Sequence, residues 1–226
     1  FPGRHACFVM ELVQGEGGFN TPKRDFLVEL MKICKANNIA VWDDEIQAFG
    51  RTTEMFAYET FDVGEYVDVF CVGKMTQACA AMFTPEYNPR PGLLSGTFSG
   101  ATADFTTGLR VLEMLEDGAY FGDDGLFNQH HAAFRAQVDA LVARHPDWFP
   151  TNHYVRDFGA GIGGMMRMTP FGGDKTKVIY DEGAVTFWCG HGPYHLRMLP
   201  PLPVLKLDQW PKIFEVLERG LAKAAG

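Results

Sequence analysis

Apolar residues in the first hundred positions fall into short continuous runs that alternate with a helical pattern. Three runs, which we expect to form buried strands, are residues 6–10, 39–42 and 67–72. Between the first two, residues 22–36 carry apolar side chains at the spacing typical of an amphipathic helix. Continuous apolar strands separated by helices predict an α/β fold with a parallel sheet covered on both faces.

The pattern changes after residue 100. A helix is expected over residues 103–115, followed by a stretch rich in glycine and acidic residues. The remaining elements that the pattern predicts are a helix at 126–144, strands at 164–168, 185–189 and 195–199, and a last helix at 208–224. We therefore expect two domains, the end of a larger α/β domain at residues 1–117 and a small α+β domain at residues 118–226.

Charge and composition exclude several classes of protein. The 226 residues have a formal net charge of −8 and no basic run, which argues against a nucleic-acid or anionic-membrane surface. No apolar stretch reaches the roughly 20 residues of a membrane helix. The five cysteines are scattered without CxxC spacing, so we expect reduced thiols in a cytoplasmic protein and no metal site.

Acidic residues end the second apolar run, where ligands of open parallel sheets bind. Asp44 is open to three interpretations: a metal ligand of the Walker-B kind, a solvated strand end, or a buried carboxylate that faces a cationic ligand. The chain has no GxxxxGK[ST] loop, which disfavours the first. Gln47 adds a neutral donor that could lie beside the same ligand.

Lys74 follows the third apolar run, after Gly73. A lysine at such a position is normally a surface residue. If it is enclosed instead, desolvation favours the neutral amine that a Schiff base requires. Asp44 and Lys74 end successive predicted strands, so they could reach opposite sides of one planar cofactor.

Six motifs occur in a fixed order: ExxQGEGG from residue 11, DEIQ from 44, FGRT from 49, GK from 73, TFSG from 97 and RxxPPL from 197. Together they resemble the class III, or ω-amino-acid type, aminotransferases, a family of fold type I enzymes that use pyridoxal 5′-phosphate. The resemblance spans residues 8–202, nearly the whole chain. It implies that the chain is the C-terminal portion of the family's usual length, with part of the large domain and the small domain.

The resemblance implies a role for each motif residue. Lys74 corresponds to the lysine that carries the cofactor as a Schiff base and moves the proton of the substrate Cα. Asp44 matches the carboxylate that keeps the pyridine nitrogen protonated, and Gln47 matches the amide beside the phenolic oxygen. Thr97 resembles the threonine that reaches the cofactor phosphate of the neighbouring subunit, which implies a dimer with shared active sites.

Two further residues would bind substrate. Arg197 matches the arginine that holds a substrate carboxylate. Glu16 resembles the glutamate that pairs with this arginine when an ω-amine substrate occupies the site. Simpler roles stay open, because Glu16 could be solvated, Arg197 could extend from an edge strand to solvent, and Thr97 could cap a helix.

The function that follows is transfer of an amino group from an ω-amino or diamino acid, similar to lysine, ornithine or GABA, to a 2-oxo acid such as 2-oxoglutarate. The alternatives are a non-catalytic half that serves as an assembly partner, or a decarboxylase or aminomutase of the same family. Phe1 is not an initiator methionine, and the family's N-terminal half has no counterpart here. We therefore expect that half as a separate chain or as an omitted part of a longer one.

Two weaker signals predict no site. Residues 159–164 fit GxGxxG, but a strand-like segment follows where a dinucleotide site needs a helix. His130 and His131 are adjacent in a predicted helix, where neighbouring side chains point apart.

Overall fold

The computed structural model describes residues 3–151 and 157–226, which form two compact units. The first unit consists of Phe1–Val13 and Pro22–Ala119, and the second of Gln14–Thr21 and Tyr120–Gly226. The segment Gln14–Thr21 packs with the second unit although it lies early in the chain.

The first unit is built on a four-stranded sheet with the order β1-β2-β3-β4. Its strands are Cys7–Met10 (β1), Ala40–Asp44 (β2), Val69–Val72 (β3) and Ala80–Phe83 (β4). The first three are parallel and coincide with the three predicted apolar runs, so the expected α/β fold with a mostly parallel sheet is confirmed. The sequence pattern did not predict β4, which pairs antiparallel with β3 at one edge.

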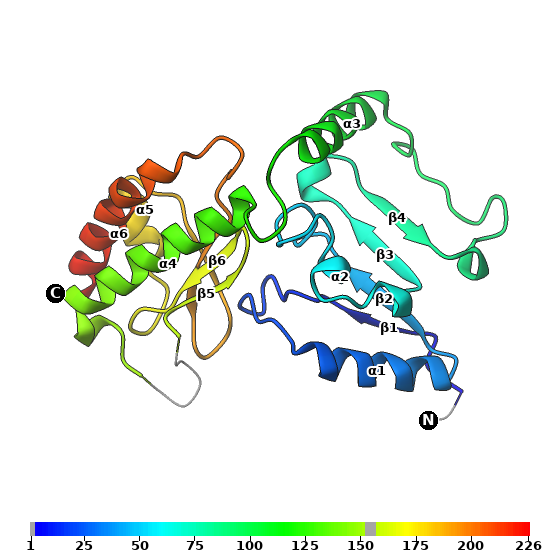
Figure 1. The fold of residues 1–226 in the computed structure, drawn as a ribbon, viewed down its shortest axis with the longest axis horizontal. Coiled ribbons are helices and arrows are strands. Elements are labelled where there is room, and N and C mark those ends of the chain that lie inside the picture. Colours follow the sequence, from blue (N-terminus) through cyan, green and yellow to red (C-terminus); the bar gives the residue numbers. More distant parts are fainter. Residues whose placement is uncertain (1–2, 152–156) are drawn as a thin grey trace. The chain divides into compact units, whose positions relative to one another are not determined.

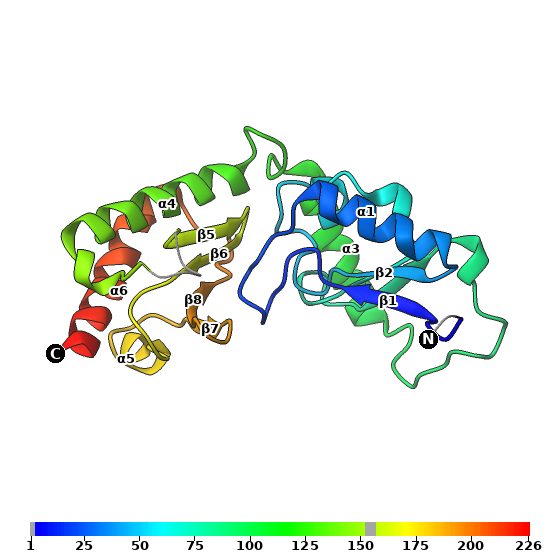
Figure 2. The same ribbon diagram turned by 90° about the horizontal axis from the view of Figure 1, so that it is seen from below.

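Helices cover this sheet and the turns at its ends. The amphipathic helix α1 (Arg24–Ala36) packs along β2 and runs beside β1 and β2 in Figures 1 and 2. Its buried residues are Leu27, Val28, Met31 and Cys34. The short helix α2 spans Ala57–Thr60, and the helix α3 (Thr102–Asp117) packs against the turn that follows β3.

The second unit has an antiparallel sheet with the order β5-β6-β8-β7. Its elements are α4 (Leu126–Arg144), β5 (Gly159–Ile162), β6 (Met165–Met168), α5 (Thr176–Asp181), β7 (Phe187–Cys189), β8 (His195–Met198) and α6 (Trp210–Ala225). The GxGxxG stretch therefore forms a strand and its turn, and another strand follows it. No helix in the described ranges is long and apolar enough to cross a lipid bilayer.

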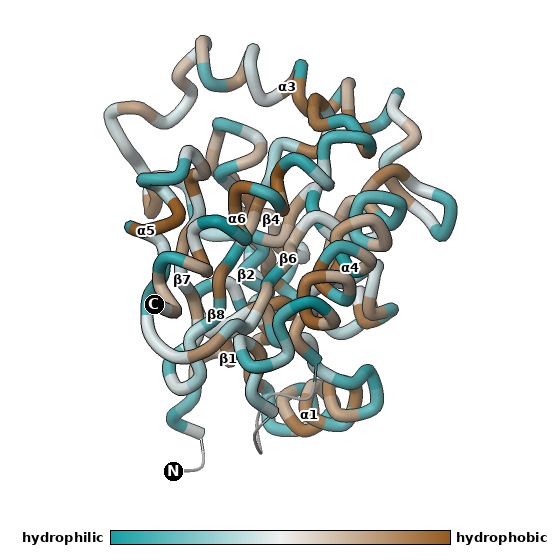
Figure 3. The backbone as a smooth tube through the Cα atoms, turned by 90° about the vertical axis from the view of Figure 1, so that its left-hand side faces the viewer, coloured by the Kyte–Doolittle hydropathy of each residue, from teal (hydrophilic) through white to brown (hydrophobic). Residues whose placement is uncertain are grey.

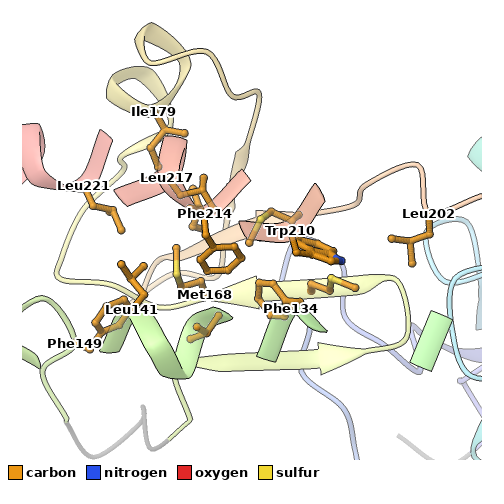
Figure 4. Packing of buried hydrophobic residues seen from close by; sticks show 14 of the residues in the cluster. Phe134, Leu141, Phe149, Met168, Ile179, Leu202, Trp210, Phe214, Leu217 and Leu221 are labelled. Atoms are coloured by element: carbon orange, nitrogen blue, oxygen red, sulfur yellow. The ribbon is translucent and has the colours of Figure 1, made fainter. Parts of the chain in front are cut away.

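One face of this second sheet is the core of the unit. Apolar side chains of α4 and α6 meet those of β6 and β8, as Figure 4 shows for Phe134, Met168, Trp210 and Phe214. Hydrophobic and hydrophilic stretches alternate along α4 in Figure 3. Because strand residues alternate between faces, the polar residues of β6 and β8 lie on the opposite face of the sheet.

A pair of carboxylates is buried in the first unit. Asp43 and Glu45 are both fully buried, and neither oxygen of Asp43 has a hydrogen-bond partner within the described residues. Oε1 of Glu45 accepts a hydrogen bond of 3.1 Å from the Tyr58 amide, but Oε2 has no partner there. Burial, and next the charge of Glu45, raises the pKa of the Asp43 carboxyl well above its usual range.

This pair makes the stability of the first unit dependent on pH. An acid whose pKa is raised on folding binds more protons in the folded than in the unfolded state. The free energy of unfolding therefore decreases as the pH rises from the unfolded-state pKa, about 4, through the raised native pKa.

We predict that Asp43→Asn stabilises the protein at pH 8, because asparagine avoids the cost of binding a proton or burying a charge on folding and offers an N–H donor to Glu45. The gain should shrink as the pH falls from 8 towards the unfolded-state pKa of about 4, below which the wild-type carboxyl is protonated in both states. Urea unfolding of both proteins across this range measures the difference. The interpretation would be contradicted if the variant were less stable than wild type at pH 8, or if the difference in unfolding free energy were the same at every pH.

Candidate active site

The parallel pairing of β2 and β3 brings two sequence-predicted residues to one edge of the sheet. Asp44 is the last residue of β2, and Lys74 follows β3 after Gly73. A Cβ atom on Gly73 would lie only 2.9 Å from Cδ1 of Ile46, so a larger residue there would displace the Ile46 side chain, and glycine allows the turn before Lys74 to pack closely on the loop after Asp44. The structure thus places the two turns side by side.

The carboxylate of Asp44 is held by one oxygen. Oδ1 accepts a hydrogen bond of 3.0 Å from the Ile46 amide and lies 3.7 Å from Sγ of Cys71. Burial raises the pKa of the Cys71 thiol, which therefore keeps its proton for this contact. Oδ2 of Asp44 has no hydrogen-bond partner within the described residues, and the side chain is half-buried. One oxygen orients the group, and no described residue donates a hydrogen bond to the other.

Cys71 and Trp42 were not predicted as neighbours of Asp44. The indole Nε1 of Trp42 lies 3.5 Å from Sγ of Cys71, so three side chains form a line on one face of the sheet. Alternation along β2 places Trp42 and Asp44 on the same face. The position of Cys71 depends on the register between β2 and β3, which a single sequence does not reveal.

Lys74 lies on a firmly packed turn. Its backbone has a left-handed φ of 49°, and its carbonyl oxygen accepts a hydrogen bond of 2.7 Å from Nε2 of Gln77. Gly108 of α3 approaches the next residues so closely that a Cβ there would lie 2.9 Å from the Thr76 carbonyl oxygen. The Lys74 side chain is exposed, so the described residues of this chain do not supply the enclosure expected around it.

Gln47 and Thr97 also belong to the first unit. Gln47 is half-buried in the loop after β2, where its carbonyl oxygen accepts a hydrogen bond of 2.9 Å from Nη1 of Arg51. Thr97 lies in an exposed loop, and its neighbour Phe98 is 84% exposed. This loop and residues 77–79, which follow Lys74, line one hollow. No recorded contact joins Thr97 to Asp44 within the described residues.

Glu16 and Arg197 meet in the second unit. Nη1 of Arg197, on β8, forms an ion pair with Oε1 of Glu16. The amide of Gly190 donates a hydrogen bond of 2.9 Å to the carbonyl oxygen of Glu16, which ties the Gln14–Thr21 segment to the loop before β8. The Arg197 side chain is mostly buried, whereas that of Glu16 is 66% exposed. The arginine is therefore fixed, and the glutamate has room to leave it.

The two adjacent histidines contact different partners within the second unit. Nδ1 of His130 accepts a hydrogen bond of 3.0 Å from Nε1 of Trp210 in the core. His131 contacts the Gly163 carbonyl oxygen instead. Residues 3–151 and 157–226 contain no group of three or more side chains that could hold a metal ion.

Comparison with known proteins shows matches along almost the full chain. Diaminobutyrate–2-oxoglutarate transaminase of Vibrio parahaemolyticus is 30% identical over 223 residues, which cover 93% of this chain and 50% of that protein. The corresponding enzyme of Halalkalibacterium halodurans is 29% identical over 96% of this chain and 49% of that protein. L-lysine-epsilon aminotransferase of Streptomyces clavuligerus is 32% identical over 152 residues, 64% of this chain and 32% of that protein. The chain spans about half the length of the diaminobutyrate transaminases.

Solved structures share the fold. The lysine aminotransferase of M. tuberculosis in the internal aldimine form superimposes with a TM-score of 0.82 at 24% identity, covering 96% of this chain and 49% of that one. Ornithine aminotransferase of Toxoplasma gondii gives a TM-score of 0.76 at 20% identity, covering 97% of this chain and 52% of that one. The architecture is therefore that of fold type I pyridoxal-phosphate enzymes.

The family assignment rests on the sequence itself. A model of the class III aminotransferases matches residues 3–221, which include all six motifs and every residue of the two sites described above. The members of this family use pyridoxal phosphate. The chain belongs to the class III aminotransferase family.

Proposed function

We propose that this chain is the cofactor-anchoring half of a pyridoxal-phosphate-dependent aminotransferase, in which Lys74 carries the cofactor. The observation that carries the proposal is the meeting of Asp44 and the Lys74 turn at one sheet edge, with Oδ2 of Asp44 unpartnered among the described residues. A protonated pyridine nitrogen is a donor that suits this oxygen. The membership of the chain in a family of transaminases supports the same function.

The residues present fit the cofactor. Asp44 would hold the ring nitrogen in its protonated form, Gln47 would lie beside the phenolic oxygen, and Lys74 would anchor the aldehyde carbon. Bound there, the cofactor supplies an electron sink for the negative charge that develops when a substrate Cα loses its proton. Nζ of Lys74 would be the base that takes this proton from the substrate Cα and the acid that later returns it.

Asp44 is suited to this role because its geometry is set before any ligand arrives. The Ile46 amide and the Cys71 thiol orient Oδ1, so little reorganisation accompanies binding at Oδ2. A carboxylate fixed in this way favours the cationic form of a ring nitrogen beside it.

We propose that Arg197 and Glu16 allow one pocket to accept substrates of different charge. With Glu16 on Arg197, the pocket is neutral and accepts the ω-amine end of an amino donor. With Glu16 turned away, the guanidinium can bind the distal carboxylate of a dicarboxylic 2-oxo acid such as 2-oxoglutarate in a bidentate manner. The names of the relatives, which act on diaminobutyrate, lysine or ornithine, support a diamino acid as donor.

We also propose that the remaining half of the family's length, as a separate chain or as an omitted part, completes each site. The coverage of about half of each diaminobutyrate transaminase supports this. Thr97 would bind the cofactor phosphate of the neighbouring subunit, so the assembly would be at least a dimer with shared sites. The large domain would comprise residues 1–117 and the small domain residues 118–226, with Gln14–Thr21 packed on the latter. Five cysteines without a disulfide favour the cytoplasm.

The adjacent acids of β2 offer a matched test of the cofactor site in the complete protein. Asp44→Asn should weaken pyridoxal-phosphate binding by roughly 10- to 150-fold, which corresponds to the loss of a hydrogen bond to a charged group. Asp43→Asn, on the opposite face of the same strand, should leave cofactor affinity unchanged. Titration of the apoprotein with cofactor, followed by absorbance, measures both. Equal affinities of wild type and Asp44→Asn would overturn the assignment of Asp44.

If Glu16 leaves Arg197 when the second substrate binds, Glu16→Gln should affect the kcat/KM values of the two substrates differently. Arg197 would then keep its charge with either substrate, so kcat/KM should fall for a diamino donor and hold or rise for 2-oxoglutarate. Because Glu16 is exposed, we expect the ratio of the two values to change by about fivefold, equivalent to ~1 kcal/mol. Steady-state kinetics with each substrate varied measures this ratio. The control is Asp62→Asn, which breaks an exposed ion pair with Arg24. A ratio that stays at the wild-type value in Glu16→Gln would refute the exchange.

A further inference from the structure

A second arginine lies directly opposite Arg197. Arg167 of β6 is the cross-strand partner of Arg197 of β8, and both point away from the core formed by the methionines on either side of Arg167. Directly opposed side chains on one face start only about 5 Å apart at Cβ, and like charges there destabilise the sheet. Glu16 offsets the charge of Arg197. No acidic side chain in the described part of the chain forms an ion pair with Arg167.

The one recorded side-chain partner of Arg167 in these residues cannot offset its charge. Nη1 of Arg167 lies 2.9 Å from the ring nitrogens of His195. Burial, and next the charge of Arg167, lowers the pKa of His195 to about 4, so this imidazole is neutral at neutral pH. Oγ1 of Thr169 lies 2.7 Å from Nδ1 of the same ring and fixes it.

Arg167 is half-buried, and no anionic partner for its guanidinium lies within hydrogen-bond distance among the described residues. Its Nε is buried without a hydrogen-bond partner in the described residues, and burial lowers its pKa. Buried charges in folded proteins are paired or bound to a ligand, since an isolated one costs several kcal/mol. A guanidinium with free donors matches the two oxygens of a carboxylate or phosphate.

Space for such a group exists beside Arg167 within the second unit. A hollow of about 310 Å³ is lined by Arg167, His195 and Asn20, and by the loop at residues 190–193. A second hollow that Arg167 also lines contains Arg135, which forms an ion pair with Asp157 at 2.5 Å. Arg167 is the cation common to both hollows, and the acid in the second one is paired with Arg135.

We propose that Arg167 is the centre of an anion-binding site that accepts a compact carboxylate or phosphate group next to the Glu16–Arg197 pair. The guanidinium binds the anion through Nε and Nη2, while His195 stays on Nη1 and holds the fork in place. Binding there places a negative charge between two opposed arginines and removes their repulsion. The site does not depend on the cofactor assignment, because all its residues lie in the second unit.

The test compares thermal stability in inorganic phosphate, in succinate and in sodium chloride of equal ionic strength, using the protein isolated with any chains that accompany it. Phosphate or succinate should raise the melting temperature of wild type in a saturable way beyond the effect of chloride. Arg167→Gln should lose this rise. Arg167→Lys should retain it with affinity reduced by about tenfold, because lysine keeps the positive charge but lacks the planar pair of N–H donors of the guanidinium. Arg110→Gln, which removes an exposed arginine of the first unit, should behave as wild type.

Each outcome decides the proposal. A rise with succinate alone identifies a carboxylate site, a rise with phosphate alone identifies a phosphate site, and a rise with both supports their shared chemistry. An equal rise in Arg167→Gln, or no rise beyond chloride in wild type, would overturn it. If Arg167→Gln does not fold, the reduced affinity of Arg167→Lys still separates this site from any other. Cofactor binding in the same samples reports on Asp44 and Lys74 independently.

Discussion

The parallel pairing of β2 with β3 is the constraint on which the candidate cofactor site depends. It places the carboxyl ends of both strands at one edge of the sheet, so that Asp44 and the Lys74 turn meet although they are thirty residues apart. The absence of a side chain on Gly73 allows this close approach, because Ile46 already fills the space. A shift of the β3 register by one residue would turn Cys71 to the other face and remove its contact with Asp44.

Two adjacent acids of β2 lie on opposite faces of the sheet and differ in their surroundings. Asp43 faces the interior beside Glu45, where burial raises the pKa of its carboxyl well above the usual range. Asp44 faces the opposite side, where one oxygen is held and the other has no partner among the described residues. Alternation between the faces of a strand is therefore enough to make one carboxyl structural and its neighbour available to a ligand.

Most of the fold could be predicted because long apolar patterns determine it locally. The runs that form β1, β2 and β3, and the helical pattern of α4, are set by burial of their own side chains. The strand β4 was missed because its residues are largely exposed, and β5 because its glycines favour a strand only when β6 pairs with it. The contacts of Asp44 with Cys71, and of Arg167 with His195, arise from strand register, so no local pattern could reveal them. Motif resemblance gave Lys74, Asp44, Gln47, Thr97, Arg197 and Glu16 as candidates and implied that Glu16 pairs with Arg197, whereas the structure added the hydrogen bonds that orient Asp44.

The most direct measurement of the central claim is borohydride reduction of the native protein, isolated with any accompanying chains and pyridoxal phosphate, followed by mass mapping of its peptides. If Lys74 anchors the cofactor, the visible absorbance should disappear on reduction and the peptide that contains Lys74 should carry the added mass of the cofactor. Cofactor fixed on a different lysine would contradict the assignment of Lys74. Absence of any fixed cofactor in the complete assembly would contradict the enzyme itself and favour an aminotransferase-like half that serves only in assembly.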